Sequence, residues 1–176
     1  MIALKWIYAT GVLLSYGLLC AFFIQRHLQR EFSRKAQVAG FVSAGESLPV
    51  CVVAYASQTG QAEELAFQTA RFLHDGGESV RLVSLGELTS EKLQQCRRLL
   101  CIASTYGEGD APDSAAPFVS EVMQSRSLNL TGLEFAVLAL GDSSYKHFCG
   151  FGRAVFHRLK SCGARPLFDL VEVDSR

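Results

Sequence analysis

The sequence predicts an α/β domain built on a doubly wound parallel sheet, preceded by one transmembrane helix. Two patterns carry this prediction. After residue 48, short apolar runs alternate with amphipathic stretches, which is typical of a parallel sheet covered by helices on both faces. Before it, residues 6–24 carry no charge and, at about 1.5 Å per residue, come close to the roughly 30 Å of a bilayer's hydrocarbon core. The segments expected are a transmembrane anchor (1–25), a basic juxtamembrane segment and linker (26–48), and the α/β domain (49–176).

The charges that flank the apolar segment predict its orientation. Arg26, Arg30, Arg34 and Lys35 follow the segment, whereas only Lys5 precedes it. The positive-inside rule then places the N-terminus outside and the following domain in the cytoplasm. A cleaved signal peptide is the alternative, but its positive cluster would come first. A buried core helix is disfavoured because every face of the segment is apolar.

The domain opens with a strand followed by a helix. Residues 49–56 are a continuous apolar, β-branched run, as in a strand buried on both faces. Residues 61–74 follow with a helical period, and glycines then end the helix. The residues expected along one side of this helix are Leu65, Ala66, Thr69, Phe72 and Leu73. The same alternation continues to the end of the chain. The further strands expected are 79–85, 99–104, 134–140 and 166–171, and the further helices are 90–95, 113–125 and 151–161.

Composition excludes several classes of function. The 17 basic and 17 acidic residues balance, and residues 36–176 hold 12 basic against 16 acidic ones, so no basic face for nucleic acid is expected. The six cysteines form no CxxC pair and have no histidine spacing suited to zinc. We read them as reduced thiols, and we assign neither a metal site nor a catalytic residue.

The loop after the first strand, residues 57–61, can hold a phosphate. Its hydroxyls and amide lead into a helix N-terminus, where main-chain N–H groups and the helix dipole favour an anion. The loop contains no lysine or arginine and matches neither GxxxxGK nor GxGxxG, so neither an NTPase nor a dinucleotide fold is indicated. Taken alone, a Thr followed by Gly at a helix start is more often just an N-cap, so this loop by itself favours a helix cap formed by Thr59.

Two further loops each offer one tyrosine beside glycines. Tyr106 lies in the loop after the third strand and Tyr145 in the loop after the fourth. In a doubly wound sheet these loops converge with residues 57–61 at the carboxyl ends of the strands. The two rings could therefore stack on the faces of an isoalloxazine. The alternative is that each ring packs against the base of its own loop.

The three loops together resemble a known family. The motifs SQTGQAEELA, STYGEGDAPDSA and LGDSSYKHFCGFG, in this order, are similar to the FMN-binding segments of the flavodoxin-like domain of diflavin reductases, which include sulfite reductase flavoproteins and NADPH-cytochrome reductases. The resemblance covers roughly residues 50–174. It implies a five-stranded sheet of order 2-1-3-4-5 and FMN as cofactor. It also implies a closing helix and a reductase domain, neither of which we expect within residues 49–176.

The resemblance implies which residues hold the cofactor. The first loop would bind the FMN phosphate, Tyr106 and Tyr145 would stack on the ring, and the rest would line the pocket. The full set expected is Ser57, Gln58, Thr59, Gly60, Gln61, Ser104, Thr105, Tyr106, Gly107, Gly109, Leu140, Gly141, Asp142, Tyr145, His147, Phe148, Cys149 and Asp174.

The function expected from this site is single-electron transfer through FMN. The donor would be an FAD/NADPH reductase domain or protein, and the acceptor a haem or iron–sulfur protein, within an NADPH-dependent oxidoreductase system. The alternative is a flavodoxin-like quinone or nitro reductase that acts directly on a small molecule. Two stacked tyrosines disfavour that alternative, because a reductase needs one open ring face for its substrate.

Overall fold

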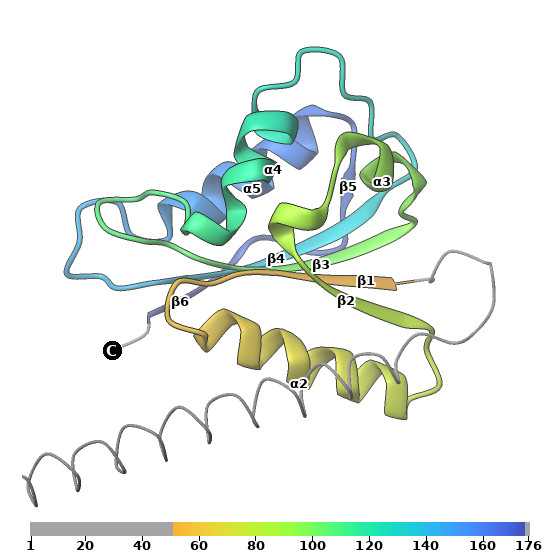
Figure 1. Cartoon of the computed structure of the whole chain (residues 1–176), viewed down its shortest axis with the longest axis horizontal. Coiled ribbons are helices and arrows are strands. Elements are labelled where there is room, and N and C mark those ends of the chain that lie inside the picture. The colour runs from red at the N-terminus through yellow and green to blue at the C-terminus, as the bar shows by residue number, and fades with distance from the viewer. Residues whose placement is uncertain (1–50, 175–176) are drawn as a thin grey trace, which may run out of the picture. The chain divides into compact units, whose positions relative to one another are not determined.

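A parallel sheet forms the centre of the computed structural model, which describes residues 51–174 (Figure 1). The strand order is β2-β1-β3-β4-β5, with β6 also paired to β4, and every pairing between named strands is parallel. The expected fold and order 2-1-3-4-5 are thereby confirmed. The strands are β1 (Cys51–Ala56), β2 (Val80–Ser84), β3 (Arg98–Ser104), β4 (Glu134–Gly141), β5 (Arg165–Pro166) and β6 (Val171–Asp174).

Helices cover both faces of this sheet. Figure 1 shows α2 on one face and α3, α4 and α5 on the other. The larger core lies on the face of the three helices, where Phe118, Phe135, Val155 and Leu159 are fully buried. The helices are α2 (Gln61–Asp75), α3 (Ser90–Gln95), α4 (Ala116–Phe118) and α5 (Gly150–Ser161), with short turns η1 (Leu85–Glu87), η2 (Asp113–Ala115) and η3 (Val119–Met123).

The buried face of α2 differs from the one expected. Ala62, Ala66 and Ala70 are fully buried, whereas Phe72 is 78% exposed. Small side chains at every fourth position let the helix backbone lie close to the sheet. The predicted side of the helix is therefore right for Ala66, which is fully buried, and wrong for Phe72, which is exposed. The alanine stripe, and not the largest apolar residue, sets which side packs.

The helix expected over residues 113–125 is broken into three short pieces. A 3-10 turn (η2) leads into α4, and a π turn (η3) follows and ends at Met123. Pro117 lies within this stretch and has no N–H to donate back to the preceding turn. A regular α-helix therefore cannot run through the start of this segment.

The edge strand expected over residues 166–171 is also interrupted. Arg165 pairs with Glu134, an offset of 31 positions, whereas Val171 pairs with Leu138, an offset of 33. Two extra residues thus loop out between β5 and β6, after a proline that cannot donate to the ladder. The two extra residues set β6 back by two positions along β4, so that Asp174 pairs with Gly141, the last residue of β4, instead of extending past it.

The transmembrane anchor and linker expected over residues 1–48 lie outside the described residues. Between Cys51 and Asp174, no helix combines the length and the apolar character needed to cross a bilayer.

Candidate functional site

A cavity of about 350 Å³ opens at the carboxyl ends of β1, β3 and β4. This volume falls in the usual range for small-molecule sites. All of its lining residues belong to the predicted set. They are Gln58, Thr59, Gln61, Ser104, Thr105, Tyr106, Gly107, Leu140, Gly141, Asp142, Tyr145, His147, Phe148 and Cys149. The predicted residues that do not line the cavity are Ser57, Gly60, Gly109 and Asp174.

The first loop turns sharply into α2 at Gly60. Its φ of 92° is a left-handed conformation that favours glycine, and its N–H donates to the Ser57 hydroxyl at 2.9 Å. Gly60 itself is the N-cap, and no side chain caps the helix. The alternative in which Thr59 caps α2 is therefore wrong. The uncapped first turn is a suitable place for an anion.

The two tyrosines reach the cavity from separate loops. Tyr106 is 55% exposed and Tyr145 is 48% exposed, so neither ring is buried at the base of its loop. A tight antiparallel bridge between Tyr106 and Asp110, with main-chain hydrogen bonds of 2.9 and 2.8 Å, shapes the first of these loops. In the loop that carries Tyr145, the Asp142 carboxylate accepts a hydrogen bond from the Ser144 N–H at 2.8 Å.

The tyrosine loops fit against each other through their backbones. A Cβ added to Gly109 would lie 2.7 Å from the His147 Cβ, closer than side chains can approach. Gly109 also has a φ of 126°, which L-residues rarely adopt. Within the loop that carries Tyr145, a Cβ on Gly141 at one end would lie 2.7 Å from the main-chain nitrogen of Cys149 at the other end. Gly109 therefore permits the close approach of the two tyrosine loops, and Gly141 permits the close approach of the two ends of the Tyr145 loop.

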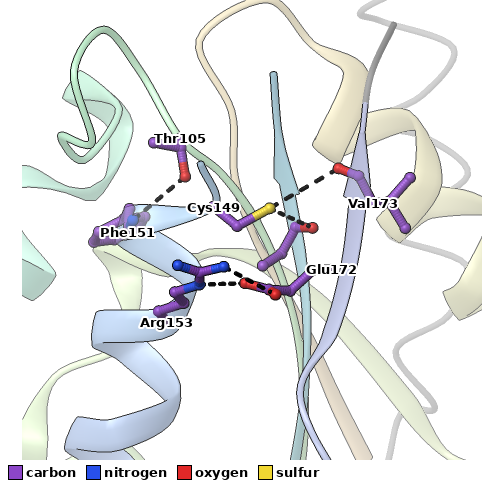
Figure 2. Close-up of polar contacts among 7 residues, drawn as sticks. Thr105, Cys149, Phe151, Arg153, Glu172 and Val173 are labelled. Atoms are coloured by element: carbon purple, nitrogen blue, oxygen red, sulfur yellow. Dashed lines mark hydrogen bonds and ion pairs between the residues drawn. The ribbon is translucent and has the colours of Figure 1, made fainter. Parts of the chain in front are cut away.

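Cys149 anchors the end of the second tyrosine loop (Figure 2). It is fully buried, has a φ of 55°, and donates its S–H to the Ala139 carbonyl at 3.3 Å. Burial, and secondly the nearby Glu172 carboxylate, raise the pKa of this thiol above its ordinary 9.0. The thiol therefore stays protonated at neutral pH and packs as a small apolar group. Figure 2 also shows the Phe151 N–H donating to the Thr105 hydroxyl, which joins the loop that carries Tyr106 to the first turn of α5.

Two contacts hold the last strand, β6, against α5 and against the loop that carries Tyr145. In Figure 2, Arg153 of α5 forms a two-pronged ion pair with Glu172 of β6. The next acidic residue, Asp174, accepts from the Ser143 N–H at 3.4 Å and from its hydroxyl at 2.5 Å. Asp174 therefore contacts the loop that carries Tyr145 and does not itself line the cavity.

The residues present fit FMN. An uncapped helix N-terminus suits the phosphate, and two half-exposed aromatic rings on facing loops suit a flat tricyclic ring. From Cys51 to Asp174, no group of three or more His, Cys, Asp or Glu side chains is arranged to hold a metal ion.

Two residues that support the first loop were not predicted. Asp113 and Ser114 of η2 hydrogen-bond to Gln58 and Ser57. They lie more than fifty positions further along the chain, and no periodicity links such distant polar residues. The one available signal was that both residues lie within the motif STYGEGDAPDSA, which includes the loop that carries Tyr106.

Comparisons with known proteins agree with this geometry. The flavodoxin family model matches residues 53–176. The sulfite reductase [NADPH] flavoprotein alpha-components of Shewanella oneidensis and Bacillus subtilis are 40% and 38% identical over 138 and 122 residues, 78% and 69% of this chain but 23% and 20% of theirs. This chain thus spans less than a quarter of the length of these relatives.

Solved flavodoxins share the fold. A Streptococcus pneumoniae flavodoxin superposes with a TM-score of 0.62 at 28% identity and covers 70% of this chain and 83% of its own. Flavodoxin 1 of Bacillus cereus gives the same TM-score and coverage at 26% identity. From the sheet order, the pocket and these matches, we conclude that the chain belongs to the flavodoxin family and that its cofactor is FMN.

Proposed function

We propose that this chain carries single electrons through FMN bound in the pocket. The donor is an FAD/NADPH reductase domain or protein, and the acceptor is a haem or iron–sulfur protein. The observation that carries the proposal is the pair of half-exposed tyrosines on two loops beside an uncapped helix N-terminus. The relatives named as NADPH sulfite reductase flavoproteins support a reductase as the donor.

The chain's own residues bind and orient the cofactor. The first-turn N–H groups of α2 and the Thr59 hydroxyl hold the phosphate, and the rings of Tyr106 and Tyr145 enclose the isoalloxazine. FMN supplies the one-electron chemistry when bound, so the protein needs no catalytic acid or base. Stacking on both faces leaves a ring edge for electron transfer and disfavours direct reduction of a small molecule.

The membrane location is part of the proposal. The uncharged run 6–24 with its C-terminal basic residues supports a single N-terminal anchor, with the N-terminus outside and the flavin domain in the cytoplasm. Carbonate extraction of membranes from cells that express the full chain tests this. Retention in the pellet is the expected result, and release into the soluble fraction contradicts the anchor.

Flavin binding is tested with the full chain in detergent. Addition of FMN should give the visible absorption bands of bound flavin and quench flavin fluorescence. Tyr145→Leu and Tyr106→Leu should each weaken FMN binding about tenfold, because an aromatic contact contributes about 0.5–1.5 kcal/mol beyond its buried area. The absence of flavin bands after FMN addition would contradict the proposal.

Electron transfer is tested separately. Photochemically reduced protein is mixed with ferricytochrome c as a probe acceptor, and haem reduction is followed by absorbance. We expect rapid transfer with two haems reduced per fully reduced flavin. Transfer that occurs only to a small quinone, and not to the haem protein, would favour the reductase alternative.

A further inference from the structure

The first loop is held from outside the pocket by the η2 turn. The Ser114 hydroxyl accepts from the Ser57 N–H at 3.3 Å and donates to the Ser57 carbonyl at 3.1 Å. One hydroxyl thus uses both its donor and its acceptor capacity on the same residue. This contact fixes the backbone at the point where β1 ends and the loop begins.

A second contact joins the same two segments. The Asp113 N–H donates to Gln58 Oε1 at 3.1 Å, and Gln58 Nε2 donates to the Asp113 carboxylate at 3.2 Å. Both ends of the Gln58 amide are therefore engaged with η2. Thr59 differs from its two neighbours: within residues 51–174, its hydroxyl makes no hydrogen bond to the protein.

The η2 turn is itself a rigid support. Its last residue, Ala115, and Phe118 of the following α4 are fully buried in the main core. The η1 turn packs directly on its backbone, since a Cβ on Gly86 would lie only 2.3 Å from the Ser114 carbonyl oxygen. The core thus fixes the backbone of η2, whereas the Asp113 and Ser114 side chains are exposed and face the loop.

We propose that Asp113 and Ser114 are positioning residues that hold the first loop in its phosphate-binding shape and so set the preference for a phosphorylated flavin. This inference rests on the proposed FMN function and deepens it. The loop has no lysine or arginine, so it must bind the phosphate with hydrogen bonds from its N–H groups and hydroxyl. Such bonds form only when each donor points at the phosphate, so binding depends on the shape of the loop. A loop ordered before binding avoids the entropy that a free loop would lose on closing around the anion.

The test compares FMN with riboflavin, which has the same ring but no phosphate. Dissociation constants are measured by flavin fluorescence quenching on the full chain and on Ser114→Ala. We expect FMN affinity to fall about tenfold and riboflavin affinity to change less than twofold, because the two hydrogen bonds that hold Ser57 are lost and the loop is no longer ordered before it binds the phosphate. Ser114→Thr keeps the hydroxyl and should restore FMN binding.

Two control sets isolate the contact. Ser120→Ala removes an exposed hydroxyl from the same helical stretch, where it donates to the Pro117 carbonyl at 2.9 Å, and should change neither ligand. Asp113→Ala and Asp113→Asn both remove the charge, but only Asn retains an oxygen that can accept from Gln58. A weaker FMN affinity for Ala than for Asn therefore measures the hydrogen bond, and it also provides the test if Ser114→Ala does not fold.

The outcomes separate the two proposals. If the unmodified chain binds no FMN, the proposed function itself fails. If it binds FMN, but Ser114→Ala leaves FMN affinity unchanged or weakens both ligands equally, the positioning role is overturned. Thermal unfolding of the flavin-free variants, with midpoints close to that of the parent, supports a local effect on the loop.

Discussion

The two halves of the flavin pocket are built in different ways. The phosphate half, residues 57–61, is held by side-chain hydrogen bonds from exposed residues of η2. The ring half, residues 104–112 and 141–149, is held by backbone fit: Gly109 lies against His147, and Gly141 lies against Cys149. Exposed hydrogen bonds can be lost one at a time, whereas a backbone fit leaves no room for an added atom.

This difference predicts how each half responds to substitution. Loss of one hydrogen bond in the phosphate half costs about 1 kcal/mol and acts on the phosphate alone. An added methyl group in the ring half displaces a whole loop and therefore affects any flavin, phosphorylated or not. The ratio of FMN to riboflavin affinity thus reports which half has been disturbed.

The largest effect is expected for Gly109→Ala. The new Cβ would lie 2.7 Å from the His147 Cβ, and the φ of 126° is strained for alanine. We expect FMN and riboflavin affinities to fall together by about 100-fold, equivalent to about 2.7 kcal/mol. Fluorescence titration of both ligands measures this.

Gly60→Ala is the matched control in the phosphate half. Its φ of 92° is also positive, but nothing lies within 4 Å of the added Cβ. We expect a loss of about tenfold from backbone strain alone, confined to FMN. If Gly109→Ala weakens FMN selectively, the ring half does not depend on backbone fit as described.

Alkaline pH should lower the free energy of unfolding of the domain, whose sheet supports both halves of the pocket. Burial raises the pKa of Cys101, at the centre of β3, from 9.0 to about 12. Above pH 9 the unfolded chain loses this proton and the folded chain keeps it, so the contribution of Cys101 to the free energy of unfolding falls by about 1.4 kcal/mol per pH unit up to about pH 12. Cys51, whose pKa burial raises to about 11, adds a loss of the same sign.

Urea unfolding from pH 8 to 10.5 measures this loss in the parent chain and in Cys101→Ala. The variant lacks the thiol, so its stability should fall less steeply with pH. Both halves adjoin the same sheet, and the ratio of FMN to riboflavin affinity should therefore stay constant in the folded protein. Parallel pH profiles for the two proteins would show that Cys101 does not titrate as described.

Much of the fold could be predicted from the sequence because its signals are local. The buried run of β1 follows from its continuous apolar residues, and the six residues of α3, Ser90–Gln95, follow the N-cap residue Thr89. The face of α2 could not be read in this way. Phe72 looks like a core residue, but Ala62, Ala66 and Ala70 pack closest to the sheet. The choice between them depends on how close the helix lies to the sheet, which is a tertiary property.

The site shows the same division. The loops that line the cavity follow adjacent strands, so the topology alone brings Thr59, Tyr106 and Tyr145 together. The supporting contacts depend on exact geometry between distant segments. Gln58 appears from its motif to be a phosphate ligand, yet its amide is engaged with Asp113. Asp174 contacts the tyrosine loop through Ser143 because two looped-out residues shift β6 along β4.

The smallest effect is expected for Glu172→Gln, which breaks the one described ion pair between β6 and α5. Its partner Arg153 has a side chain 48% exposed, so solvent screens the pair and its loss should have only a small effect. Because β6 supports the ring half through Asp174, FMN and riboflavin affinities should fall together by less than about fivefold, and the difference from the parent should vanish near 1 M salt. Asp75→Asn removes the exposed Arg71–Asp75 pair of α2 and should change neither affinity. A selective loss of FMN in Glu172→Gln would mean that β6 also acts on the phosphate half, and the division between the two halves would then fail.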